Sequence, residues 1–195
     1  MDHERFWNWF RTNADIIASG YDGEQLTEGL AEKIESEWPE LSWEIGPDPS
    51  GCLYLSISPN LNKGLIPQAN KAVGSAPSIP GWKFYPYRQR KKWDGRFEMH
   101  TSRGVAQIDS SSWNFVLLRY PDGGHEVFLI GDKALWLNEE DRWQAAAIVV
   151  EGMIGEKCIL ENDLSFSLDD RPEPQFEGKE KPIRELPGAF GLGDL

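Results

Sequence analysis

The sequence predicts a two-layer α+β fold, with an N-terminal pair of helices and a mainly antiparallel sheet that carries helices on one face. Two observations lead to this class. Apolar residues recur every three to four positions before residue 40 and at every second position after it, which is the change from helical to strand periodicity. The short strands are also separated by turns rich in proline and glycine, without the regular alternation of strands and helices that builds a parallel sheet.

The first two predicted helices cover residues 3–19 and the segment from Asp22 to Trp38. In the first, apolar residues spaced by three or four positions form one stripe: Phe6, Phe10, Ala14 and Ile17. In the second, the corresponding stripe is Leu26, Leu30, Ile34 and Trp38, with Pro39 as its end. Its outer side carries Glu24, Glu28, Glu32 and Glu35. We interpret this acidic side as a solvated face or as a recognition face.

Residues 41–89 read as a β-β-α-β unit. Residues 41–45 and 53–57 alternate apolar and polar side chains around a turn that contains two prolines and two glycines, which is typical of a hairpin. A short helix is predicted over residues 65–75, where Pro67 fits only the first turn. A strand starting at Trp82 follows the Pro80-Gly81 turn, and we expect its indole to face the helices.

The second half repeats this plan loosely. Strands are predicted over residues 105–108, 113–120, 125–130 and 165–168. Asn138 caps a helix before the last of these strands. The predicted buried stripe of that helix is Trp143, Ala146, Ala147, Val150 and Ile154. We therefore predict one α+β domain over residues 1–170, with loose β-β-α-β halves at 41–89 and 105–168, and an extended tail over 171–195.

Composition and charge narrow the class of protein. Nine tryptophans in 195 residues are typical of a folded core, and two cysteines are too few for a disulfide framework. The chain lacks an apolar run long enough to span a membrane and a signal-peptide pattern at its start, so we expect a cytoplasmic protein. The net charge of −12 disfavours nucleic acid as a partner and favours a protein with a basic surface.

The opening Phe6-Trp7-Asn8-Trp9-Phe10 resembles the Phe-Trp-x-Trp-Phe start of a group of bacterial proteins whose function is not established. Two further segments are similar to motifs of that group: the Ala-Pro-x-x-x-Gly-Trp segment at residues 76–82 and the helix end Gly155-Glu156. The resemblance covers residues 5–170. It implies a bacterial, cytoplasmic α+β domain of unknown function and brings no catalytic residues with it.

Motifs for catalysis, metals or cofactors are not evident in the sequence. The histidines and cysteines stand far apart, and the glycine-rich segment 46–51 does not have the ending of a phosphate-binding loop. Ser110, Ser111 and Ser112 are explained by a turn. We therefore predict no catalytic residues, no metal site and no cofactor.

One stretch of the sequence is cationic. Residues 51–100 contain eight lysines and arginines against two acidic residues, and most of these cations lie between residues 88 and 96 beside aromatic rings. Cations mixed with rings are typical of surfaces that bind single-stranded nucleic acid, and Trp93 is expected to be partly exposed. The predicted binding residues are Arg88, Arg90, Lys91, Lys92, Trp93 and Arg96. The competing interpretation is that these cations pair within the protein, for example with the acidic second helix.

Three functional hypotheses follow from the sequence. The first is a non-catalytic protein-binding or regulatory domain, of which a toxin-neutralising immunity protein would be one instance, because the chain is rich in Trp, Tyr and Arg, the residues of interface hot spots. The second is a nucleic-acid-binding or regulatory module that uses residues 82–96. The third is an enzyme of a type that its motifs do not reveal. The sequence does not set the oligomeric state.

Overall fold

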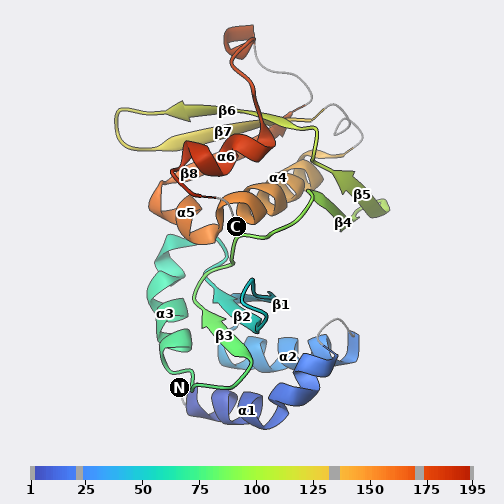
Figure 1. Ribbon diagram of the computed structural model, residues 1–195, viewed down its shortest axis with the longest axis vertical. Coiled ribbons are helices and arrows are strands. Elements are labelled where there is room, and N and C mark those ends of the chain that lie inside the picture. Colours follow the sequence, from blue (N-terminus) through green and yellow to red (C-terminus); the bar gives the residue numbers. More distant parts are fainter. Residues whose placement is uncertain (1–2, 21–23, 132–136, 170–173, 194–195) are drawn as a thin grey trace. The chain divides into compact units, whose positions relative to one another are not determined.

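The computed structural model describes residues 3–20, 24–131, 137–169 and 174–193, and Figure 1 shows its helices and strands. The predicted α+β class is confirmed, but the strands form three sheets instead of one. Contacts divide the chain into two compact units, residues 1–88 and 89–195. The single domain over residues 1–170 stays a prediction.

The first unit contains three helices and one three-stranded sheet. The helices are α1 (His3–Ser19), α2 (Glu24–Glu37) and α3 (Ile66–Gly74), the last preceded by a 3-10 turn, η1 (Lys63–Leu65). The strands are β1 (Ser42–Pro47), β2 (Leu53–Ser58) and β3 (Trp82–Tyr85), in the order β1-β2-β3. β1 and β2 form the predicted antiparallel hairpin. β3 pairs with β2 in parallel, because the chain crosses over through α3 before it returns.

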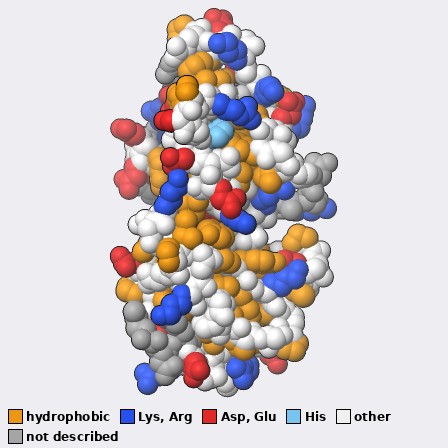
Figure 2. Space-filling model, turned by 90° about the vertical axis from the view of Figure 1, so that its left-hand side faces the viewer, with side chains coloured by type: hydrophobic (Ala, Val, Ile, Leu, Met, Phe, Trp, Pro, Cys, Tyr) orange, Lys and Arg blue, Asp and Glu red, His pale blue; other side chains and the backbone are white. Residues whose placement is uncertain are grey.

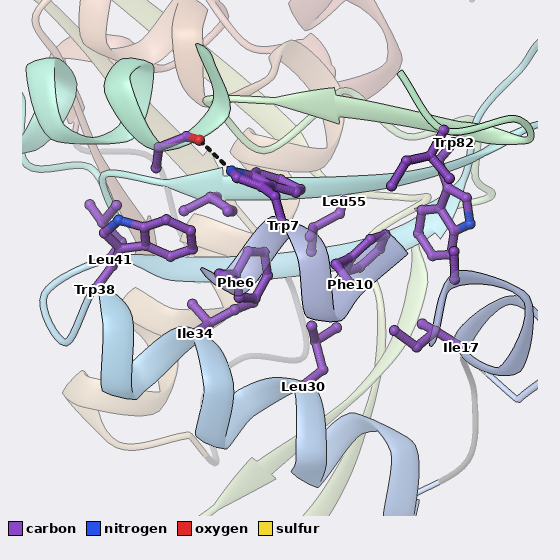
Figure 3. Packing of buried hydrophobic residues seen from close by; sticks show 14 of the residues in the cluster. Phe6, Trp7, Phe10, Ile17, Leu30, Ile34, Trp38, Leu41, Leu55 and Trp82 are labelled. Atoms are coloured by element: carbon purple, nitrogen blue, oxygen red, sulfur yellow. Dashed lines mark hydrogen bonds between the residues drawn. The ribbon is translucent and has the colours of Figure 1, made fainter. Parts of the chain in front are cut away.

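The core of this unit is an aromatic cluster between the helices and one face of the sheet (Figure 3). Phe6 and Trp7 of α1 meet edge to face with ring centroids 4.9 Å apart, and Phe10 meets Trp82 of β3 in the same way at 4.8 Å. The Trp7 Nε1–H donates to the carbonyl oxygen of Ala72 in α3 at 2.9 Å, so the indole is buried without losing its hydrogen bond. The predicted stripes of the first two helices are therefore confirmed where their side chains are described, and Trp82 faces the helices as expected.

The second unit contains the remaining strands and helices. A separate two-stranded sheet is formed by β4 (Arg96–Thr101) and β5 (Gly104–Asp109). A four-stranded sheet has the order β8-β7-β6-β9, with β6 (Asn114–Arg119), β7 (His125–Ile130), β8 (Leu164–Asp169) and β9 (Lys181–Pro182). The helices are α4 (Glu139–Ile154), α5 (Glu156–Glu161) and α6 (Leu186–Ala189), and two 3-10 turns, η3 (Pro174–Phe176) and η4 (Ile183–Glu185), lie in the C-terminal segment.

The same connectivity occurs in both units. In the first, an antiparallel hairpin is followed by a helix and then by a strand parallel to its neighbour, over residues 42–85. In the second, β6 and β7 form the hairpin, α4 and α5 follow, and β8 pairs in parallel with β7, over residues 114–169. β3 and β8 hold equivalent positions, and each is an edge strand of its sheet among the described residues.

Helix α4 starts as the sequence predicts, but one residue of its buried stripe is wrong. The Asn138 side chain accepts a hydrogen bond from the Asp141 backbone N–H at 2.8 Å, which caps the helix. Ala146, Ala147, Val150 and Ile154 are buried. Trp143, predicted to lie with them, is 55 % exposed. Trp143 lies one turn into α4, at the border of the buried stripe of the helix. Helical periodicity alone therefore did not predict whether this indole is buried or exposed.

The C-terminal segment contributes to the second unit. β9 pairs with β6 at the sheet edge opposite β8. Phe176 packs on Phe128 of β7 with ring centroids 5.0 Å apart, and Ile183 and Leu186 are buried. The sequence predicted residues 171–195 as an extended tail that Ile183, Leu186 and Phe190 would attach to the domain. Ile183 and Leu186 are attached in this way, and the half-buried Phe190 ring lies 5.8 Å from that of His125 in β7.

Candidate interaction surfaces

The predicted cationic stretch crosses the boundary between the two units, and Arg88 lies at the end of the first. Its Nη2 donates to the Ser42 hydroxyl at 2.9 Å and to the Asn60 side-chain oxygen at 3.0 Å. Ser42 in turn lies 3.1 Å from the Ser58 hydroxyl on the neighbouring strand. This guanidinium therefore joins β1 to the residues that follow β2.

Arg90 and Lys91 are attached to the C-terminal end of α4. Arg90 Nε donates to the Met153 carbonyl oxygen at 3.0 Å, and its Nη2 donates to the Gly193 carbonyl oxygen at 3.0 Å. The Lys91 backbone N–H donates to the Gly152 carbonyl oxygen at 2.8 Å. The last carbonyls of a helix lack partners within it and carry partial negative charge, so a cation here stabilises the helix end. The side chains of Lys91 and Lys92 are exposed.

Trp93 packs against the same helix. It is half-buried, its ring lies 5.6 Å from that of Phe97 in β4, and it approaches Gly152 so closely that a Cβ there would lie 2.7 Å from the indole. The partial exposure predicted for Trp93 agrees with this position. Its Nε1–H is buried and has no hydrogen-bond partner among the described residues.

Arg96, the last predicted binding residue, is exposed at the start of β4 and pairs with two carboxylates. Its Nε lies 3.1 Å from Asp109 Oδ2, and its Nη1 lies 3.5 Å from Asp94 Oδ2. Among the described residues, the carboxylates that pair with Arg96 are thus Asp94, just before β4, and Asp109, at the end of β5. The structure brings Arg90, Lys91 and Trp93 together at the end of α4, where they hold the chain against that helix.

A polar cluster that the sequence did not reveal covers the second face of the first sheet. Lys83 Nζ lies 2.7 Å from Asp48 Oδ1, and the Tyr85 hydroxyl donates to Asp48 Oδ2 at 3.0 Å. The Tyr54 hydroxyl donates to Glu44 Oε2 at 3.1 Å. Sequence alternation predicted a polar face here, but Tyr54, Ser56 and Ser58 are buried. The Ser56 hydroxyl has no hydrogen-bond partner among the described residues.

The shifts in this cluster move the pKa values of Asp48, Tyr54 and Tyr85 further from neutral pH. The Lys83 ammonium, with the Ser50 hydroxyl and amide, holds the pKa of Asp48 well below its usual range. Burial, with the nearby Glu44 carboxylate, raises the pKa of Tyr54, and burial with the Asp48 hydrogen bond raises that of Tyr85. General acid–base catalysis favours a pKa near the working pH. These groups instead keep one protonation state, as expected for a structural ion pair.

A shallow groove of about 330 Å³ runs beside β3. It is lined by all four residues of that strand and by the segment that joins α3 to it, including Val73, Ala76, Pro77 and Ile79. The lining is mainly apolar and holds one charged side chain, that of Lys83, which is bound to Asp48. The groove is therefore suited to contact with an apolar group and not to acid–base chemistry.

The most exposed aromatic contact on the described surface joins α4 to β8. The Trp143 indole stacks on Phe166 with ring centroids 6.0 Å apart and planes inclined by 26°. Trp143 is 55 % exposed and Phe166 is half-buried, so both rings present apolar surface to solvent. Next to them, Arg142 Nη1 lies 3.6 Å from Asp169 Oδ1 at the end of β8. We call Trp143 and Phe166 the aromatic pair.

Several carboxylates lie near the aromatic pair in sequence and are exposed. Glu139 and Glu140 are exposed in the first turn of α4, where they favour the positive end of the helix. Glu161 and Asp163 precede β8, and both are exposed. In the face that Figure 2 shows, acidic and basic side chains are interspersed among apolar ones.

No group of three or more His, Cys, Asp and Glu side chains suited to a metal ion is found in the described part of the chain. Cys52 and Cys158 are free thiols, and burial raises the pKa of Cys158. Among the described helices, none is both long and apolar enough to cross a membrane. Comparisons of the chain with protein-family profiles, with curated proteins and with solved structures found no match.

Proposed function

We propose that this chain is a non-catalytic protein-binding domain and that the aromatic pair is the centre of its binding surface. The observation that carries the proposal is the exposure of Trp143, which lies stacked on Phe166 with more than half of its surface in solvent. Two adjoining rings open to solvent form a continuous apolar surface, and Trp, with Tyr and Arg, is enriched in interface hot spots.

The charges near the aromatic pair support a basic partner. Glu139 and Glu140 lie one turn before Trp143, and the whole chain carries a net charge of −12. Complementary charge around an apolar centre speeds association and selects the partner, while the desolvated rings supply most of the affinity. The partner expected from this chemistry is a protein with a cationic surface around an apolar anchor.

Copurification from cells that naturally express the chain tests the proposal. Tagged wild-type protein, Trp143→Ala and the control Tyr120→Ala are captured in parallel, because Tyr120 is also an exposed aromatic residue of the second unit, at 44 % exposure. We expect a stoichiometric partner with wild type and Tyr120→Ala that is lost with Trp143→Ala. A partner retained equally by all three proteins would show that binding uses another surface.

A further inference from the structure

The outer edge of β8 presents backbone groups that the sheet does not use. His125 N–H donates to the Asp163 carbonyl at 3.4 Å, and Gly131 N–H donates to the Asp169 carbonyl at 2.8 Å. Successive residues of a strand direct their backbone groups to opposite edges, so the odd-numbered residues of β8 face β7. The amides and carbonyls of Leu164, Phe166 and Leu168 face the other edge, where no strand of the described chain pairs with them.

The aromatic pair lies directly beside this edge. Phe166 is the middle residue of the outward-facing set, and its ring carries the Trp143 indole from α4. Phe166 is also paired across the sheet with Val127, which is fully buried, so its side chain lies on the inner, apolar face. An added strand would therefore place every second side chain against Phe166 and Trp143.

The charges at the two ends of β8 decide which kind of strand fits. Glu161 and Asp163 lie before the strand and Asp169 lies at its end. Lys157 Nζ is 3.6 Å from Glu161 Oε1 and Arg142 Nη1 is 3.6 Å from Asp169 Oδ1, so Glu161 and Asp169 each face one cation. The three carboxylates still outnumber these two cations. If two copies paired their β8 edges antiparallel, the acidic start of one strand would face the acidic end of the other, and this repulsion disfavours a second copy as the partner. The same carboxylates favour a cationic segment.

We propose that an extended, cationic segment of a partner protein adds as a fifth strand at the outer edge of β8. Its backbone pairs with Leu164, Phe166 and Leu168, one apolar side chain covers the aromatic pair, and lysine or arginine residues flank that side chain. Edge pairing supplies affinity through main-chain hydrogen bonds, while the rings and the carboxylates select the sequence. This inference rests on the proposed function and names the form and charge of the partner.

A random twelve-residue peptide library displayed on phage, selected against the full chain, tests the proposal. We expect enriched peptides to contain an apolar residue flanked by lysine or arginine. Binding of the synthetic peptides should weaken at least tenfold with Trp143→Ala and with the double change Glu161→Lys and Asp169→Lys, which reverses one charge at each end of β8. The control Glu177→Lys, an exposed charge reversal next to Phe176 on the opposite face of the sheet, should leave the affinity unchanged.

Amide hydrogen exchange then separates strand addition from simple contact with the rings. Saturation with an enriched peptide should slow exchange at Leu164, Phe166 and Leu168 at least tenfold, and N-methylation of alternate peptide amides should abolish that protection. Peptides that depend on Trp143 but leave these three amides unprotected would overturn strand addition and leave the proposed function intact. A library that yields no Trp143-dependent peptides would also overturn strand addition. So would protection of these three amides in a dimer of the free chain. The copurification experiment decides the proposed function separately.

Discussion

Lys83 Nζ lies 2.7 Å from Asp48 Oδ1 and joins β3 to the turn of the β1–β2 hairpin. The pKa of Asp48 is lowered in the folded protein, so the unfolded chain binds more protons in acid and stability falls as the pH drops. Asp109, with a pKa of about 2, acts in the same direction. We expect full stability above about pH 5 and a progressive loss below it.

Urea unfolding at several pH values between 2 and 7 measures this loss. Asp48→Asn should lower the stability at pH 7 and make its decline toward pH 2 less steep, because the group that takes up the proton is gone. Glu32→Gln, at an exposed position of α2, is the matched control. The same acid dependence in wild type and Asp48→Asn would contradict the assignment of the shift to this ion pair.

Trp82 and Trp93 should differ in their effect on stability. Trp82 is buried against Phe10, so Trp82→Ala leaves a cavity in the core and should lower the free energy of unfolding by about 3–5 kcal/mol. Trp93 is half-buried and already lacks a partner for its Nε1–H, so Trp93→Ala should cost less than half as much. Chemical denaturation of both variants measures the difference. Equal losses of unfolding free energy would mean that Trp93 contributes as much to stability as Trp82.

Gly152 and Gly29 both lie inside helices, yet substitution by alanine should change the stability of the protein in opposite directions at the two positions. A Cβ at Gly152 would lie 2.7 Å from the Trp93 ring, so Gly152→Ala should lower stability by about 1–3 kcal/mol. Outside the backbone of its own helix and its chain neighbours, no atom lies within 4 Å of a Cβ at Gly29, so Gly29→Ala should raise stability by about 1 kcal/mol through helix propensity. If Gly152→Ala is as stable as wild type, Trp93 does not pack on α4 as described.

The C-terminal segment should be needed for full stability of the second unit. Leu186 is completely buried, so Leu186→Ala should cost about 2–5 kcal/mol, and deletion of residues 171–195 should lower the melting temperature strongly. Arg184→Ala, at an exposed neighbouring position, is the control. A truncated chain that melts at the same temperature as the full-length protein would show that the pairing of β9 with β6 and the packing of α6 do not contribute to stability.

Local patterns in the sequence predicted most of the elements. The stripe from Phe6 to Ile17 and the hairpin around residues 46–51 are correct because side-chain periodicity and turn residues act over a few positions. The parallel pairing of β3 with β2 was not predicted, since it depends on the crossover through α3, a contact between distant segments. β4 was not among the predicted strands, although Arg96, Glu98 and His100 alternate with Phe97 and Met99 in the period of a strand, because its first residue was assigned to the cationic stretch.

The candidate surfaces were harder to predict than the fold. The cations between residues 88 and 96 stand out in the sequence, but their partners include backbone carbonyls of Met153 and Gly193, which carry no sequence signal. Trp143 was placed in the core because it shares the helical stripe with Ala147 and Val150. Its exposure depends on where α4 crosses the edge strand β8, and only the tertiary structure sets that position.

The central claim is that Trp143 is the anchor of a protein interface, and calorimetric titration of the copurified partner tests it most directly. Trp143→Ala should weaken binding by about 30-fold or more, the loss expected for a hot-spot residue, without changing the melting temperature. Trp143→Phe, which keeps an aromatic ring over Phe166, should recover most of the affinity. An unchanged dissociation constant for Trp143→Ala would contradict the claim.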